Sequence, residues 1–425
     1  MRLDKMSADE VRAIYNEAKD AYDGFCAEKL SLNMTRGKPC REQLDSVSGI
    51  LTCLTAEEDF TLASGEDIRN YGGWNGLPQM RAIFSEMMGV PAENIVLGNN
   101  SSLQLMFDAV AQGYSHGYSG CEPWGRQGTV KFLCPTPGYD RHFAVTEYFG
   151  FELISVPMLS TGPDMDEIER LIADETVKGC WCVPKYSNPT GVTYSDETVR
   201  RFAALRPAAK DFRIFWDNAY TVHDLTDTPE PLLNLYEECL RNGTEDQVFF
   251  FASTSKISFP GAGVAAIGAS DENLKAIRHR MSFQTIGPDK VNQLRHVKYF
   301  KDIDGIRAAM ARHRQILAPK FERVETLFAQ QLGGLGIAAW NEPKGGYFIN
   351  LDVMEGCAAR VVSLCKTAGL VLTAAGSAYP YGKDAKDTNI RIAPTMPPME
   401  ELDKSVRILC TAIRMAAAEK ILGRV

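Results

Sequence analysis

The segment RIFWDNAY, residues 213–220, is a short apolar run that ends on a carboxylate, followed three residues later by a tyrosine. Runs of this length, bounded by polar residues, are typical of buried strands. Six further runs have the same character, at residues 94–97, 130–134, 152–156, 179–183, 248–252 and 263–268. Helical patterns separate several of them, at residues 101–111, 165–173 and 196–205. This alternation predicts an α/β fold in which helices flank a mostly parallel central sheet.

The pattern changes after the last of these strands. Residues 289–332 are helical in pattern, a length that calls for a break, and Pro319 would supply a kink. The elements expected beyond it are strands at residues 345–352, 371–374 and 389–394 and helices at residues 357–368 and 399–417. They indicate a smaller α+β domain over residues 296–425, after a large domain over residues 51–295. The N-terminal segment, residues 1–50, should pack on the small domain or on a partner subunit.

Composition narrows the class of protein. The chain has 425 residues, 45% of them hydrophobic, and carries a formal net charge of −8. This length and composition fit a large globular protein, and the negative charge argues against nucleic acid as a partner. We find no apolar run of about 18 residues and no secretory signal in the charged N-terminal segment, so we expect no membrane association.

The cysteines bear on compartment and metal binding. Their number, eleven, is odd, and they are scattered along the chain, which fits a reducing compartment better than a disulfide framework. Cys180 and Cys182 form the closest pair and lie in an apolar run, where core thiols are more common than zinc ligands. We therefore expect a cytoplasmic protein without a metal site.

Four short motifs follow one another along the chain: SNPTG at residues 187–191, WDNAY at 216–220, STSK at 253–256 and NIRIAP at 389–394. Asn188 and Asp217 are 29 positions apart, and Asp217 and Lys256 are 39 apart. Each interval accommodates a helix that returns the chain to the same edge of the sheet. Because residues just beyond the carboxyl ends of parallel strands converge on one crevice, we expect these side chains to meet there.

In this order the motifs resemble those of the pyridoxal-phosphate-dependent aminotransferases of fold type I (class I/II), and within them an aspartate-aminotransferase-like subgroup. The resemblance extends from about residue 31 to the C-terminus. It implies pyridoxal 5′-phosphate as the cofactor and a homodimer with shared active sites. The implied reaction moves an amino group between aspartate or glutamate and the 2-oxo acids 2-oxoglutarate and oxaloacetate by a ping-pong mechanism.

The resemblance assigns the covalent chemistry to Lys256. Its amine would form a Schiff base with the cofactor aldehyde and then move a proton between the substrate α-carbon and C4′ of the cofactor. Asp217 would pair with the protonated pyridine nitrogen, because a buried carboxylate needs a cationic partner. Tyr220 and Asn188 would donate hydrogen bonds to the cofactor O3′, and Tyr139 in PTPGYDRHF would stack on the ring.

A phosphate group needs small residues and spare backbone donors at a helix N-terminus. Ser101 and Ser102 open a predicted helix after GNN, and Ser253 adds a hydroxyl. Tyr71 in YGGWNG matches the family tyrosine that reaches the phosphate from the neighbouring subunit. The chain departs from many relatives at residues 260–265, PGAGVA, where they carry a phosphate-binding arginine. Another cation, further backbone donors or the helix dipole must replace that charge.

Substrate recognition requires cations. Arg391 in NIRIAP matches the family arginine that binds the α-carboxylate through two parallel hydrogen bonds. The resemblance also assigns Asn188 to substrate binding. Arg36 and Arg141 are candidates for the distal carboxylate, although each could equally pair with a surface acid. Gly37 in TRGKP resembles the family loop that closes over substrate and would contribute a backbone contact.

Two other functions stay open. One is a different reaction on the same scaffold, either transfer from aromatic amino acids such as kynurenine or a β-lyase step. The other is a non-catalytic, pyridoxal-phosphate-binding effector domain like those fused to bacterial regulators. The sequence shows no helix-turn-helix extension or basic region, which disfavours the effector domain. It leaves open the preferred amino donor and acceptor, and the cation that holds a distal carboxylate.

Overall fold

The computed structural model describes residues 2–55 and 60–424. An eight-stranded sheet with the order β2-β9-β8-β7-β6-β3-β4-β5 lies at its centre. The strands are β2 (Ile95–Leu97), β3 (Lys131–Thr136), β4 (Glu152–Leu159), β5 (Gly162–Pro163), β6 (Val177–Cys182), β7 (Arg213–Asp217), β8 (Val248–Ser253) and β9 (Ala265–Ala269). Neighbours from β8 to β4 pair in parallel, whereas β2, β9 and β5 pair antiparallel. The predicted α/β fold with a mostly parallel sheet is confirmed.

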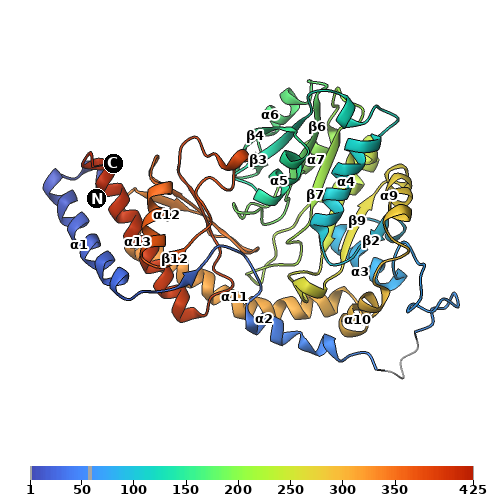
Figure 1. The fold of residues 1–425 in the computed structure, drawn as a ribbon, viewed down its shortest axis with the longest axis horizontal. Helices are drawn as coiled ribbons and strands as arrows, with labels where there is room; N and C mark the ends of the chain where they lie inside the picture. Colours follow the sequence, from blue (N-terminus) through green and yellow to red (C-terminus); the bar gives the residue numbers. More distant parts are fainter. Residues whose placement is uncertain (1, 56–59, 425) are drawn as a thin grey trace.

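Both faces of this sheet are buried. Along β8, Val248 and Phe250 point into the core on one face, and Phe249 and Phe251 into the core on the other. Helices α4 (Ser102–His116), α5 (Asp140–Tyr148) and α9 (Asp271–Gln284) cover the second of these faces, and α3 (Pro78–Met88), α6 (Met165–Leu171), α7 (Asp196–Ala204) and α8 (Leu235–Asn242) cover the first (Figure 1). Because successive strand residues face opposite sides, a sheet covered twice requires the near-continuous apolar runs seen in the sequence.

Polar residues set where several of these helices begin. Ser101 accepts a hydrogen bond from the Gln104 amide ahead of α4, and Ser195 accepts one from the Thr198 amide ahead of α7. Such caps satisfy backbone donors that have no partner inside the helix, and each contributes about 1 kcal/mol. The cap at Ser101 also fixes the helix end that faces the cavity described below.

A smaller unit lies beside the large sheet. Its antiparallel sheet has the order β10-β11-β13, with β10 (Ala338–Trp340), β11 (Ile349–Val353) and β13 (Asn389–Ile392), and α12 (Ala358–Thr367) and α13 (Met399–Ile421) pack with it. The N-terminal helix α1 (Ala8–Ala27) lies along α13, and β1 (Leu32–Asn33) pairs in parallel with β12 (Leu370–Val371). Figure 1 shows both chain ends together in this unit. The first part of the chain therefore completes a unit formed mainly by the last part.

A long helix joins the two units. The short helix α2 (Arg41–Ser46) packs against this long helix. After the large sheet, α10 (Lys290–Phe300) leads into α11 (Ile303–Leu332). Helix α11 contributes Ile306 to the core of the large unit and Leu327 to the core of the smaller one. The break falls at Lys301, whose φ is 69°, and Asp302 caps α11 by accepting from the Gly305 amide. Pro319, where the sequence predicts a kink, lies inside α11 and does not end it. The strong cap and the left-handed residue, not the proline, interrupt the helix.

Two expectations about cysteines and membranes can be compared with the structure. All eleven cysteines are free thiols, and the sulfurs of Cys180 and Cys182 lie 3.9 Å apart inside the core. In the described ranges, no helix has the length and apolar character needed to cross a membrane.

Candidate functional site

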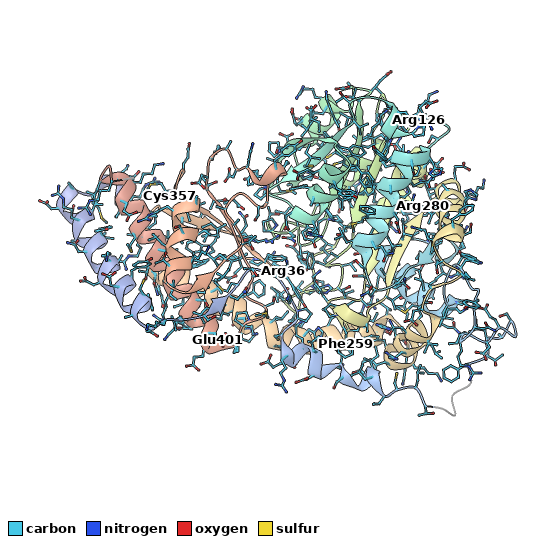
Figure 2. All side chains as sticks on the ribbon, in the orientation of Figure 1. Arg36, Arg126, Phe259, Arg280, Cys357 and Glu401 are labelled. Atoms are coloured by element: carbon cyan, nitrogen blue, oxygen red, sulfur yellow. The ribbon has the colours of Figure 1, made fainter. Side chains whose placement is uncertain are left out.

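A cavity of about 550 Å³ lies at the carboxyl ends of β6, β7 and β8, where the two units meet. Figure 2 shows Arg36 at this junction. Twelve of the thirteen residues selected from the sequence line it: Arg36, Gly37, Ser101, Ser102, Tyr139, Arg141, Asn188, Asp217, Tyr220, Ser253, Lys256 and Arg391. The size is that of a cofactor or small-molecule site. The thirteenth residue, Tyr71, is 76% exposed and is not part of this lining.

Asp217 ends β7, so its carboxylate lies at the tip of a fully buried strand. Its Oδ2 is 3.0 Å from Nε2 of His142, a ring that stacks on Trp181 with centroids 4.5 Å apart. Its Oδ1 is buried, and no hydrogen-bond partner for it exists in the described part of the chain. One carboxylate oxygen of Asp217 therefore contacts His142, and the other can accept a hydrogen bond from a ligand in the cavity.

Lys256 follows β8, three residues after the strand ends. Its Nζ lies 4.9 Å from the ring centroid of Tyr220 and 5.9 Å from that of Tyr347. Burial lowers the pKa of the Lys256 amine below the ordinary value of 10.5, and the negative charge of Asp217 opposes this shift only in part. A lysine with a depressed pKa has a larger neutral fraction near neutral pH, as a nucleophile or a base requires.

Three further polar groups face the same space. Asn188 is buried, and its Oδ1 has no hydrogen-bond partner among residues 2–55 and 60–424. Tyr139 precedes α5, contacts His142 edge-on at 4.8 Å between centroids, and has its pKa raised to about 12 by burial. Burial also raises the pKa of Tyr220 well above 10. Both phenols therefore stay protonated and can donate hydrogen bonds near neutral pH.

The N-terminus of α4 forms one end of the cavity. Ser101 and Ser102 lie there beside Ser253, whose hydroxyl donates to Ser255 Oγ at 3.1 Å. Ser255 in turn donates to the Asn100 carbonyl at 3.1 Å, which ties the loop after β8 to the start of α4. Backbone donors at a helix N-terminus together with hydroxyls make a binding site for an anion such as phosphate.

The loop at residues 260–265, which lacks the arginine of many relatives, runs next to this end. The Asn292 amide donates to the carbonyls of Ala262 and Gly263, at 3.0 Å each. A second cavity, of about 460 Å³, is lined by Gly263, Asn100 and the side of α10 that carries Arg295. Arg295 is the cation that α10 contributes to this neighbouring space.

Arg391 lies in β13 of the smaller unit, across the cavity from Lys256. Its guanidinium sits over the Phe348 ring at 5.0 Å and donates from Nη1 to Asp140 Oδ1 at 2.7 Å. Phe348 is in turn packed against Gly37, where an added Cβ would lie only 2.6 Å from the ring. The loop that contains Gly37 and the guanidinium of Arg391 therefore both contact the Phe348 ring.

Arg36 and Arg141 are both exposed at the cavity lining. Within the described residues neither has a hydrogen bond or ion pair from its guanidinium, so both remain available to an anion. This arrangement places three arginines, including Arg391, around a cavity that also contains Asp217 and Asp140. The cavity can bind a ligand with more than one negative group despite the net charge of −8 on the chain.

Sequence reasoning missed three residues at this site: Asp140, His142 and Phe348. Asp140 and His142 lie in the motif PTPGYDRHF that was selected for Tyr139, so the signal was present but incomplete. A lone histidine or aspartate carries no pattern that reveals a partner 75 or 251 positions away. No cluster of metal-ligating side chains occurs in the part of the chain that the structure describes.

The chain is similar to known proteins over its whole length. The family model for aspartate amino-transferase matches residues 6–425. A protein of Mycolicibacterium smegmatis is 48% identical over 426 residues, covering 100% of both chains. An aspartate aminotransferase of Corynebacterium glutamicum is 44% identical over 418 residues, covering 98% of this chain and 96% of its own.

The solved structures agree. The crystal structure of an aspartate transaminase from Corynebacterium glutamicum, also 44% identical, has a TM-score of 0.96 and matches 99% of each chain. An α-aminoadipate aminotransferase from Thermus thermophilus, 19% identical, shares the fold with a TM-score of 0.75 over 91% of this chain and 93% of its own. From the match along the whole chain, and from relatives of this identity, it follows that the protein belongs to the aspartate amino-transferase family.

Proposed function

We propose that the protein is a pyridoxal-phosphate-dependent aminotransferase that moves an amino group between aspartate or glutamate and a 2-oxo acid, 2-oxoglutarate or oxaloacetate. One observation carries the proposal: the amine of Lys256 and the half-paired carboxylate of Asp217 line the same cavity as Arg391. The Corynebacterium glutamicum relative named aspartate aminotransferase supports the choice of substrate.

The residues present fit the cofactor. Asp217 Oδ1 and Asn188 Oδ1 are buried polar atoms without partners in the described ranges, a costly state that a polar ligand would relieve. The first would accept a hydrogen bond from the pyridine nitrogen, and the side-chain amide nitrogen of Asn188 would donate to O3′, with Tyr220 beside it. The helix end at Ser101 would hold the phosphate. When bound, the cofactor supplies an electron sink for the electrons released at the substrate α-carbon.

The chain's own residues supply binding and proton movement. Lys256, whose amine burial keeps partly neutral, would take the proton from the α-carbon and return it in the reverse direction. Arg391 would fix the α-carboxylate and thereby the direction of the α-C–H bond. Tyr139 would cover one face of the ring, where it also excludes water.

A distal carboxylate needs a second cation. Arg36 and Arg141 are the exposed guanidinium groups at the cavity lining, and we propose that they select acidic side chains. Gly37, which is packed against Phe348, would contribute a backbone contact when the loop closes. A charge-neutralising change at either arginine should reduce activity with aspartate more than activity with alanine.

We propose that the chain divides into a large domain over residues 51–295 and a small domain over residues 296–425, which residues 1–50 complete.

We also propose a cytoplasmic homodimer in which Tyr71 contributes to the partner's site. Tyr71 is held outward: the next amide, that of Gly72, donates to the Ile286 carbonyl at 3.1 Å. Ile286 and Phe283 are themselves 58% and 80% exposed. Large exposed apolar side chains that lie close together support an interface at this surface.

The dimer can be tested by complementation. Tyr71→Ala and Lys256→Ala subunits, each defective alone, are mixed under conditions that exchange subunits. If Tyr71 serves the partner's site, one site of each mixed dimer contains both native residues, and activity rises above that of either parent. If Tyr71 serves its own site, both sites stay defective and mixing recovers nothing.

The proposed activity is tested with purified protein and added cofactor. We expect the cofactor absorbance band of the wild type to respond to aspartate and glutamate, and Lys256→Ala to abolish that response together with transamination. Lys275→Ala, on the exposed side of α9, is the matched control and should behave as the wild type. Full turnover by the Lys256 variant would refute the proposal. Faster reaction with kynurenine or cystathionine would instead indicate the aromatic aminotransferase or the β-lyase.

A further inference from the structure

The arginine proposed to bind the substrate α-carboxylate already has an anionic partner in this structure. Nη1 of Arg391 donates to Oδ1 of Asp140 at 2.7 Å. The Arg391 side chain is 6% exposed and that of Asp140 is 33% exposed. Asp140 is the first residue of α5 over the large sheet, whereas Arg391 belongs to β13 of the smaller unit. The ion pair therefore bridges the two units across the cavity.

This pairing competes with a ligand. A carboxylate forms its strongest contact with a guanidinium through two parallel hydrogen bonds. One terminal nitrogen of Arg391 is taken by Asp140, and Nε is buried with no partner in the described part of the chain. The face of the guanidinium is covered by Phe348. A ligand carboxylate therefore obtains a two-pronged contact with the terminal nitrogens only by taking Nη1 from Asp140.

We infer that Asp140 is a specificity-determining residue that occupies the place of the substrate carboxylate on Arg391 and exchanges with it when substrate binds. The inference rests on the proposed function, because it assumes that Arg391 binds the α-carboxylate. It has a physical rationale. An unpaired, almost buried guanidinium is costly, so a resident carboxylate stabilises the empty site and raises the affinity that an anion needs to displace it.

The exchange also discriminates among ligands. A simple anion offers Arg391 one contact and gains little over Asp140, whereas an amino acid gains further contacts in the same cavity. Asp140 belongs to the same helical turn as Tyr139 and His142, of which the second contacts Asp217. Release of Asp140 from Arg391 thus takes place next to Tyr139, which lines the cavity, and to His142, which binds Asp217.

The test uses the holoenzyme and the variant Asp140→Asn, which keeps the size of the side chain and removes its charge. Succinate, a dicarboxylate without an amino group, serves as an equilibrium probe, and aspartate serves as the substrate. We expect the succinate dissociation constant and the KM for aspartate to fall about three- to tenfold, the range expected for a partly exposed ion pair. The kcat and the cofactor absorbance should change less than twofold.

Three controls separate the exchange from other effects. Glu147→Gln removes the same charge from an exposed position of α5 and should leave both constants unchanged. Asp140→Glu keeps the charge and should stay within about twofold of the wild type. In the Arg391→Gln background, Asp140→Asn should no longer tighten succinate binding, because the cation that both carboxylates share is gone.

The opposite results overturn the inference. A rise in KM for Asp140→Asn would show that Asp140 positions Arg391 for substrate, and unchanged constants would show that the two carboxylates do not compete. The outcomes distinguish this inference from the proposed function. Unchanged succinate affinity in an active aminotransferase refutes the exchange alone, whereas tighter succinate binding by a protein that transaminates no amino acid refutes the proposed function alone.

Discussion

Replacement of Gly37 by alanine should weaken substrate binding through Phe348. A Cβ at Gly37 would lie 2.6 Å from Cζ of the Phe348 ring and 3.0 and 3.2 Å from its two neighbours. Carbon atoms in favourable contact are about 3.5–4.0 Å apart, so the ring or the loop must move by about 1 Å. Because the guanidinium of Arg391 lies over the same ring at 5.0 Å, this displacement reaches the proposed carboxylate site.

The size of the effect follows from that displacement. A shift of about 1 Å in a positioned group costs up to about a hundredfold in catalytic efficiency. The loop is partly exposed and can absorb part of the shift, so we expect the KM for aspartate to rise about ten- to a hundredfold. Gly37 does not have a positive φ, so alanine is not excluded there by backbone conformation and acts through the contact with Phe348. The cofactor absorbance should be unchanged.

The assay is steady-state transamination, coupled to reduction of the oxaloacetate that forms. Gly24→Ala is the matched control, because an added Cβ in that position of α1 meets nothing within 4 Å. The double variant Gly37→Ala/Phe348→Leu makes room for the methyl group and should recover part of the lost affinity. An unchanged KM for Gly37→Ala, or a loss of cofactor with normal substrate affinity, would refute the reasoning.

Two further changes have defined outcomes. His142→Phe keeps the stacking on Trp181 but removes the hydrogen bond to Asp217. We expect kcat to fall about ten- to a hundredfold, the range for loss of a hydrogen bond to a charged group. An unaltered kcat in the same transamination assay would contradict this prediction. Burial and repulsion from Glu342 and Glu322 raise the pKa of Glu325 from 4.5 to about 7. Between these values the folded chain binds a proton that the unfolded chain has lost, so Glu325 makes stability fall as pH rises. Glu325→Gln should therefore raise the free energy of unfolding by about 1 kcal/mol at pH 8, after allowance for solvent screening, and leave it nearly unchanged at pH 4. Urea denaturation at both pH values measures the two free energies, and an equal gain at both would contradict the prediction.

The sequence was most informative where local pattern and structure share a cause. A strand buried on both faces is apolar at most positions, so the apolar runs within Val248–Ser253 and Arg213–Asp217 can be recognised without knowledge of their neighbours. The polar residues that follow such strands come together because parallel strands end at one edge. That rule brought Asn188, Asp217 and Lys256 into one predicted crevice, and all three line the cavity.

The helical connection shows where local rules give different answers. Proline is a strong interruption signal, and the sequence placed the kink at Pro319. In the structure, α11 continues through Pro319 and packs in both cores, and the interruption falls at Lys301. Packing along this 30-residue helix stabilises it by more than the loss of one backbone hydrogen bond at the proline costs. A local sequence pattern gives no measure of that packing.

The sequence by itself determined the fold class, the order of the motifs and, through the resemblance that those motifs carry, twelve of the residues that line the cavity. Spacing along strands and helices accounts for the convergence of Asn188, Asp217 and Lys256. Only the tertiary structure decided which side chains pair. It joined Asp140 to Arg391 and His142 to Asp217, and it brought both Gly37 and Arg391 against the Phe348 ring. It also left Tyr71 exposed and outside the lining of the cavity. The reason is that a hydrogen bond or ion pair across hundreds of residues is fixed by how the two units pack, and packing leaves no periodic mark on the sequence.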